Sequence, residues 1–282
     1  MRSSVGARLR LVIISVLALS VAPLAAAPSA AAAEDLLPDL KMSELYNLQI
    51  ERGGSGAFKL RFGTIVWNVG DGPLDVKAGN RVDNVMHDVA QVIHSRGGAQ
   101  RDYAPPGATA FYAGDGHDHW HISTFITIAL FPTDGAGSTV QASPTYNQRG
   151  LRKIGFCLTD LVRAPAALRP SNSASRIGFP VSGCGVITSQ QVRMGISVGF
   201  GDDYKPFFNH QSVDITGLPS GTYRLCATVN PNGVWQEKDA DRINNSSWVE
   251  IDLDNEAHRF RVVGTGDNDC GKPAPMVYGI GG

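Results

Sequence analysis

The chain lacks a charge excess of either sign and contains little cysteine. It has 282 residues, with 25 Lys and Arg against 26 Asp and Glu, so its formal net charge is −1. Electrostatic binding to nucleic acid needs a basic surface, so this balance argues against that function. Four cysteines are too few for a disulfide-dense miniprotein. Charged residues make up only 18% and hydrophobic residues 43%, which excludes a disordered polymer and allows a sizeable core.

Long apolar runs are also scarce, and the one present lies at the N-terminus. Residues 11–22 are mostly apolar and too few to span a bilayer comfortably. They follow Arg2, Arg8 and Arg10 and lead into small residues over 25–33, which is typical of a secretory signal peptide. A membrane anchor is the alternative. We expect a signal peptide over 1–33 and a secreted, extracellular single domain over 34–282 that has no membrane segment. Export makes disulfides chemically reasonable.

No stretch shows sustained helical periodicity or an internal repeat. The 32 Gly and 16 Pro residues favour many turns and short strands over a helical bundle. Apolar and polar residues alternate over 60–65 and 223–229, each followed by a turn rich in Asn and Gly, and 248–253 is another short apolar run. Residues 44–50 fit a short strand or a helical turn.

These patterns predict an all-β fold, mainly an antiparallel β-sandwich with long loops and little helix. We expect a loop over 164–175 and a Gly- and Pro-rich tail over 264–282. The four cysteines allow three pairings, and sequence alone cannot choose among them. Cys157–Cys184 with Cys226–Cys270 is favoured, because each pair closes a moderate loop within one region.

Three of the seven histidines lie in one short segment. His117, His119 and His121 are spaced two apart, so in an extended strand they would point to one face. The other face would carry a core-facing set: Trp120, Ile122, Thr124, Ile126 and Ile128.

Neutral imidazole suits copper, zinc, iron and nickel, so this segment predicts a metal site. In a regular strand the outer two histidines would be roughly 13 Å apart. All three reach one ion only if the strand bends, which Gly114 and Gly116 would permit. The alternative is a fortuitous cluster on a polar strand face.

An ordered set of motifs, together with the histidines, resembles the lysyl oxidase family of copper amine oxidases that oxidise peptidyl lysine. Each motif alone is weak, but the order is fairly specific and covers most of residues 37–253. The chain is similar to a secreted bacterial member of this family. The matching motifs are His-x-His-x-His at 117–121, Lys-x-x-Phe-Cys-Leu-x-Asp at 153–160, Gly-Ile-Ser with a later Tyr at 195–204, Asp-Ile-Thr at 214–216, Val-Asn-Pro at 229–231 and Asp-x-x-Asn-Asn at 241–245, with Leu-Pro-Asp-Leu at 37–40 and Leu-Arg-Phe at 60–62.

The resemblance implies that the three histidines bind copper and that Lys153 and Tyr204 form the lysine tyrosylquinone cofactor. Copper and O₂ can oxidise a phenol to an ortho-quinone, and a lysine amine can add to that electrophilic ring. Without the family context, Lys153 would be a solvated charge and Tyr204 an ordinary aromatic residue. The chain has fewer cysteines than animal members. No catalytic base is carried over, because four candidates stay open: Asp202, Asp203, His210 and a copper-bound hydroxide.

A second metal is predicted near the end of the chain. Four side-chain oxygens gather within seven residues, a density of hard ligands that suits calcium. Some family members have a calcium site made of such a segment and an Asp-Leu pair near the start. An Asx-rich turn that caps its own backbone is the alternative. The corresponding positions here are Asp239, Asp241, Asn244 and Asn245, with Asp39 and the carbonyl of Leu40.

The resemblance implies a protein-lysine 6-oxidase-like enzyme. It would convert a primary amine, with O₂, to an aldehyde, ammonia and hydrogen peroxide. Its partners would be lysine-bearing extracellular proteins or small primary amines. Two other functions stay open. A non-catalytic exported copper-binding β domain would need the histidines but neither Lys153 nor Tyr204. A calcium-stabilised extracellular adhesion module would need neither copper nor quinone.

Overall fold

The computed structural model describes residues 34–114, 116, 118–133, 152–209, 211–238, 243–267 and 270. All of them belong to one compact unit, Ala33–Gly282. The predicted signal peptide over 1–33 and residues 271–282 of the predicted tail lie outside the described residues. Within these residues, no helix has the length and apolar character needed to cross a membrane.

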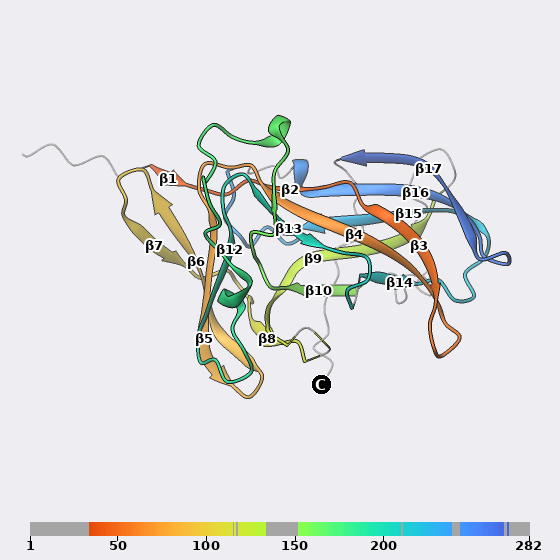
Figure 1. Ribbon diagram of the computed structural model, residues 1–282, viewed down its shortest axis with the longest axis horizontal. Helices are drawn as coiled ribbons and strands as arrows, with labels where there is room; N and C mark the ends of the chain where they lie inside the picture. Colours follow the sequence, from red (N-terminus) through yellow and green to blue (C-terminus); the bar gives the residue numbers. More distant parts are fainter. Residues whose placement is uncertain are drawn as a thin grey trace, which may run out of the picture. The chain divides into compact units, whose positions relative to one another are not determined.

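Two antiparallel sheets make up the described unit (Figure 1). The larger sheet runs in the order β12-β5-β6-β8-β9-β15-β16-β17, with β1 and β7 paired to β6 and β10 paired to β9. Its strands are β1 (Asp35–Leu36), β5 (Leu74–Val82), β6 (Val85–Ser95), β7 (Gln100–Tyr103), β8 (Ala110–Tyr112), β9 (Trp120–Pro132), β10 (Arg152–Phe156), β12 (Val192–Ile196), β15 (Gly221–Val229), β16 (Ser246–Asp254) and β17 (Arg259–Asp267).

The smaller sheet is built around its longest strand, β4 (Phe58–Asn68). Every other strand of this sheet pairs with β4 except β11 (Val162–Arg163), which pairs with β13 (Phe200–Tyr204). Its strands are β2 (Leu40–Met42), β3 (Tyr46–Arg52), β4 (Phe58–Asn68), β11 (Val162–Arg163), β13 (Phe200–Tyr204) and β14 (Ser212–Asp214). One buried core draws residues from both sheets, including Leu60 and Phe62 of β4 and Ile122 and Ile126 of β9. The only helices in the described residues are short 3-10 turns: η1 (Ala166–Leu168), η2 (Val181–Cys184) and η3 (Ile243–Asn245).

The predicted all-β antiparallel fold is confirmed. The alternating segments 60–65 and 223–229 lie in β4 and β15, and 248–253 lies in β16. The ambiguous segment 44–50 is a strand from Tyr46 onward. These segments fold as strands because one side chain of each alternating pair enters the shared core.

The predicted tail is wrong at its start, because residues 264–267 continue β17 along β16. Gly264 and Gly266 lie against the ring of Trp248, and a Cβ at Gly266 would be within 2.7 Å of three of its atoms. Gly266 therefore lets an edge strand pack over a large aromatic ring, where a side chain would collide with it. The flexibility of the two glycines as isolated residues suggested a tail, but the partner strand decides the conformation.

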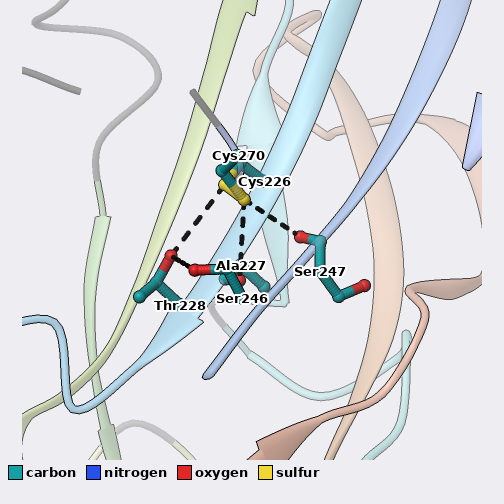
Figure 2. Close-up of a disulfide and its surroundings, with 6 residues drawn as sticks. All are labelled: Cys226, Ala227, Thr228, Ser246, Ser247 and Cys270. Atoms are coloured by element: carbon teal, nitrogen blue, oxygen red, sulfur yellow. Dashed lines mark hydrogen bonds between the residues drawn. A yellow bond between two sulfur atoms is a disulfide. The ribbon is translucent and has the colours of Figure 1, made fainter. Parts of the chain in front are cut away.

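Both predicted disulfides are confirmed. Cys157 pairs with Cys184 and Cys226 with Cys270, at Cα–Cα distances of 5.7 and 5.8 Å. Figure 2 shows the second bridge against β15 and β16, where Cys270 Sγ lies 3.4 Å from the carbonyl oxygen of Ser247. This bridge fixes the chain after β17 to the sheet. The first ties the residue after β10 to η2.

Candidate active site

The histidine segment is not one extended strand, which corrects the expectation from its spacing. β9 begins only at Trp120, so His119 precedes the strand and His121 lies inside it. Upstream, Gly114 and Gly116 have φ angles of 55° and 96°, values that side chains disfavour, so the chain turns there. The predicted core-facing set is confirmed for Trp120, Ile122, Ile126 and Ile128, which are all buried. His121 and Ser123 in the opposite row are buried as well. Within the sheet, β9 pairs with β10 at one edge and with β8 and β15 at the other.

The rings of His119 and His121 lie close together, with centroids 4.9 Å apart and planes tilted by 52°. Metal–nitrogen bonds of about 2 Å would put two imidazole centres on one ion roughly 4.5–6 Å apart. The pair therefore fits a shared metal ion, and imidazole suits copper. His117 lies outside the described residues, and within them no group of three His, Cys, Asp or Glu is placed to hold a metal.

His121 is fixed from two sides by β8 and β10. It is 4% exposed, pairs in register with Phe111, and meets that ring edge-on at a centroid distance of 5.6 Å. On the β10 side, a Cβ at Gly155 would be 2.4 Å from the Phe111 ring and 2.9 Å from His121 Cβ. Gly155 therefore lets β10 pack directly against the stem of His121.

β10 connects the histidine to Tyr204. The backbone N–H of Cys157 donates a hydrogen bond of 2.9 Å to the hydroxyl of buried Tyr204. The rings of Phe156 and Tyr204 lie 4.3 Å apart. Lys153 lies on the same strand, with its Cα opposite Thr127, and its side chain is outside the description. The fold thus brings His121, the strand that carries Lys153, and Tyr204 together across a sequence separation of about 80 residues.

Tyr204 ends β13, and the two acidic residues before it have different surroundings. Asp203 accepts hydrogen bonds from the Tyr46 hydroxyl and the Lys205 ammonium. Asp202 is 2% exposed, and within the described residues neither of its carboxylate oxygens has a hydrogen-bond partner. Burial, reinforced by the nearby charges of Asp203 and Asp160, raises the pKa of Asp202 well above its usual range. His210, another candidate base, lies outside the described residues.

The loop after β13 folds back over Tyr204. The Phe208 ring meets Tyr204 edge-on at 5.8 Å, and the Arg61 guanidinium donates to the carbonyls of Pro206 and Phe208. A Cβ at Gly116 would lie 3.2 Å from Asn209 Nδ2, so this loop also reaches the turn before the histidines. These supporting residues could not be predicted from the sequence. The pattern around Arg61 indicates only a strand, and no local signal connects it to a loop 145 residues later.

The residues predicted to bind calcium meet in part. Asn244 Nδ2 donates 2.8 Å to the Asp39 carboxylate, although the two residues are 205 positions apart. Asn245 is 2% exposed, and its Nδ2 donates to Glu237 Oε1 and to the carbonyl of Val229. Within the described residues, the Oδ1 atoms of Asn244 and Asn245 are buried without a hydrogen-bond partner. Asp239 and Asp241 lie outside those residues.

Glu237 joins this cluster although it precedes the predicted calcium segment by two residues. Its Oε1 accepts hydrogen bonds from Asn230 and Asn245, and its Oε2 accepts one of 2.8 Å from the backbone N–H of Leu40. Burial outweighs these bonds and raises the pKa of Glu237 to about 7. An acidic residue within a Gln-, Asp- and Asn-rich stretch was the available signal.

Comparison with known protein families assigns part of the chain. The family model described as lysyl oxidase matches residues 181–263. This match supports membership of the chain in the lysyl oxidase family. It includes Tyr204 and the Asn244–Asn245 pair, whereas the histidine segment and Lys153 precede it. The family suggests oxidoreductase activity of the copper amine oxidase kind. No curated protein matches the chain.

Proposed function

We propose that this protein is a secreted copper amine oxidase that deaminates primary amines oxidatively. The balanced reaction converts RCH₂NH₂, O₂ and H₂O to RCHO, NH₃ and H₂O₂. The proposal rests on one observation above all, the hydrogen bond from Cys157 N–H to the Tyr204 hydroxyl. This bond holds the Tyr204 ring at the end of the strand that carries Lys153, beside the strand that carries His121.

The proposed cofactor is lysine tyrosylquinone formed from Lys153 and Tyr204, which would supply an electrophilic carbonyl and an electron sink. Lysine is suited to the cross-link because its amine is nucleophilic and its stem is long. Cys157 N–H would hold the ring oxygen in place. Phe156 and Phe208 pack against the ring and would exclude water from it.

Copper would bind His117, His119 and His121. The support from the described residues is the 4.9 Å separation of the His119 and His121 rings, and Gly155 and Phe111 would hold His121 in its orientation. In this proposal calcium is structural, bound by Asp39, the Leu40 carbonyl, Asp239, Asp241, Asn244 and Asn245. The buried Oδ1 atoms of Asn244 and Asn245 support it, because an unpartnered buried amide oxygen is costly unless a ligand occupies it.

The proposed substrates are lysine side chains of extracellular proteins or small primary amines. The export that this requires is proposed from the N-terminal sequence, whose basic and apolar regions fit a signal peptide. In an oxidising compartment the disulfides Cys157–Cys184 and Cys226–Cys270 would persist.

A peptide digest of aerobically copper-loaded protein tests the proposal. Mass spectrometry should find a peptide that joins Lys153 to Tyr204, and Lys153→Ala should lose both this peptide and amine-dependent peroxide release. Lys153→Ala should still bind copper, because the histidines are intact. Copper binding without a cross-link would favour the copper-binding β domain instead. Calcium binding without copper binding would favour the adhesion module.

A further inference from the structure

Adjacent acidic residues on β13 lie on opposite faces of the strand, because successive strand side chains alternate. Asp203 faces Tyr46 and Lys205, and both side chains donate hydrogen bonds to its carboxylate. Asp202 is on the same face as Tyr204, two residues away. Their Cα atoms are therefore about 7 Å apart along the strand. Only Asp202 shares the side of the sheet on which the Tyr204 ring packs.

The Asp202 carboxyl is buried, and no contact among the described residues explains why a carboxyl is needed there. Neither oxygen accepts a hydrogen bond in those residues, although the side chain is 2% exposed. A buried unpaired carboxylate costs several kcal/mol, so a purely structural position would normally carry an apolar or amide residue. Such groups are retained where chemistry needs them.

We propose that Asp202 is the catalytic base of the proposed amine oxidation. This inference rests on the proposed function. In the step assigned to Asp202, the C–H bond on the carbon next to the substrate nitrogen breaks. Its proton would move to a carboxylate oxygen of Asp202, and the quinone, when formed, would accept its electron pair. O₂ would then take up two electrons and two protons to give hydrogen peroxide.

The surroundings of Asp202 make it a stronger base than an exposed aspartate. Burial raises the pKa of Asp202, and the charges of Asp203 and Asp160 raise it further. Asp160 accepts hydrogen bonds from the backbone N–H groups of Gly178, Phe179 and Ser197. A second carboxylate that must share this region holds its proton more tightly, which favours proton uptake from a weakly acidic carbon.

The test uses the copper-loaded full chain and the isosteric variant Asp202→Asn. Quinone content is measured by phenylhydrazine labelling and by the Lys153–Tyr204 peptide. The variant is then mixed anaerobically with benzylamine, in protonated and α-deuterated forms, and bleaching of the quinone absorbance is followed. We expect a quinone content within about twofold of wild type. The bleaching rate should fall by about 10²–10⁴-fold, the usual contribution of a general base. The bleaching rate of Asp202→Glu should be at least about tenfold higher than that of Asp202→Asn.

Asp75→Asn is the matched control, because Asp75 is also a buried aspartate but lies on β5 and contacts Arg193 and His94. It should lower the melting temperature through the weakened contact with Arg193, yet keep the bleaching rate within about threefold. Bleaching by Asp202→Asn at the wild-type rate would overturn the assignment. So would a folded Asp202→Asn protein without quinone, which would place Asp202 in cofactor formation. Absence of quinone from the wild-type protein would overturn the proposed function together with the assignment.

Discussion

At the scale of single residues, the packing at Gly155 leaves no room for a side chain. A Cβ there would lie 2.4 Å from two atoms of the Phe111 ring and 2.9 Å from His121 Cβ. Gly155→Ala must therefore move Phe111 or β10, and both hold His121. Overpacking of this kind costs about 1–3 kcal/mol.

We expect Gly155→Ala to lower the melting temperature and to weaken copper binding in an isothermal titration. Gly54→Ala is the control, because a Cβ at Gly54 meets nothing within 4 Å. Copper affinity that is unchanged in Gly155→Ala would show that His121 is not held through β10.

The Tyr204 hydroxyl gives a second prediction at this scale. Tyr204→Phe keeps the ring contacts but leaves the N–H of buried Cys157 without its acceptor. We expect a loss of about 1–3 kcal/mol in the free energy of unfolding measured with urea, and complete loss of the cross-linked peptide. Wild-type stability in Tyr204→Phe would contradict the role given to this hydrogen bond.

Glu237 makes the calcium-free protein sensitive to pH. Its pKa is about 7 in the folded chain, against 4.5 for an ordinary glutamate, so the folded state binds its proton more tightly. Stability from this group is therefore present below about pH 4.5 and is lost as pH rises to about 7. The loss amounts to a few kcal/mol.

Glu237→Gln keeps an oxygen for Asn230 and Asn245 but removes this titration. We would measure the free energy of unfolding with urea, in EGTA, at pH 4.5, 5.5 and 7. As pH rises, the stability of the variant should increase relative to that of the wild type. A difference that stays constant with pH would refute the assignment of this titration to Glu237.

At the scale of elements, alternation was enough to predict β4, β15 and β16, because each places one row of side chains in the shared core. It failed at His119, which precedes β9, because a metal-ligand spacing imitates a strand while Gly114 and Gly116 turn the chain. It also missed the continuation of β17 through residues 264–267, whose conformation depends on the Trp248 ring of the neighbouring strand. Local sequence predicts an element correctly where the side chains of that element decide which face is buried. It fails where a neighbouring strand decides the conformation.

The disulfide at the end of β10 gives a prediction for that element. Cys157 and Cys184 are 27 residues apart in sequence, and a bridge of that span contributes about 3–4 kcal/mol through the unfolded state. We expect the double variant Cys157→Ala, Cys184→Ala to lose stability of this order in urea unfolding. It should also form less Lys153–Tyr204 cross-link, because Cys157 N–H positions the Tyr204 hydroxyl. Full cross-link yield in the double variant would show that β10 holds Tyr204 without the bridge.

At the scale of the whole molecule, the candidate site draws on both sheets. His121 and Lys153 come from β9 and β10 of the larger sheet, whereas Asp202 and Tyr204 come from β13 of the smaller one. Residue types and motif order were enough to name Lys153 and Tyr204, but not the neighbours that distinguish Asp202 from Asp203. That distinction depends on Tyr46, which is 157 residues from Asp203 and reaches it only through the pairing of β3 and β13 with β4.

The calcium proposal is tested at the same scale, because the cluster ties the start of the domain to a late loop. Asp39 precedes β2 and meets Asn244 in η3, so an ion bound there would join segments 205 residues apart. An ion that binds only the folded chain stabilises it by about 2.7 kcal/mol at a hundred times its Kd. For a domain of this size, we expect calcium to raise the melting temperature by about 5–10 °C over EGTA.

Asn244→Ala should abolish most of that rise, because it removes one of the buried amide oxygens and the contact with Asp39. Gln190→Ala is the control, since its exposed side-chain amide donates to the Thr188 carbonyl, which is outside this cluster. Magnesium should give a much smaller rise, because it demands a tighter octahedral shell than amide and carboxylate oxygens from distant segments readily form. An equal rise in Asn244→Ala would place any calcium elsewhere and leave the Asn244–Asp39 contact as an ordinary polar link between the two ends of the domain.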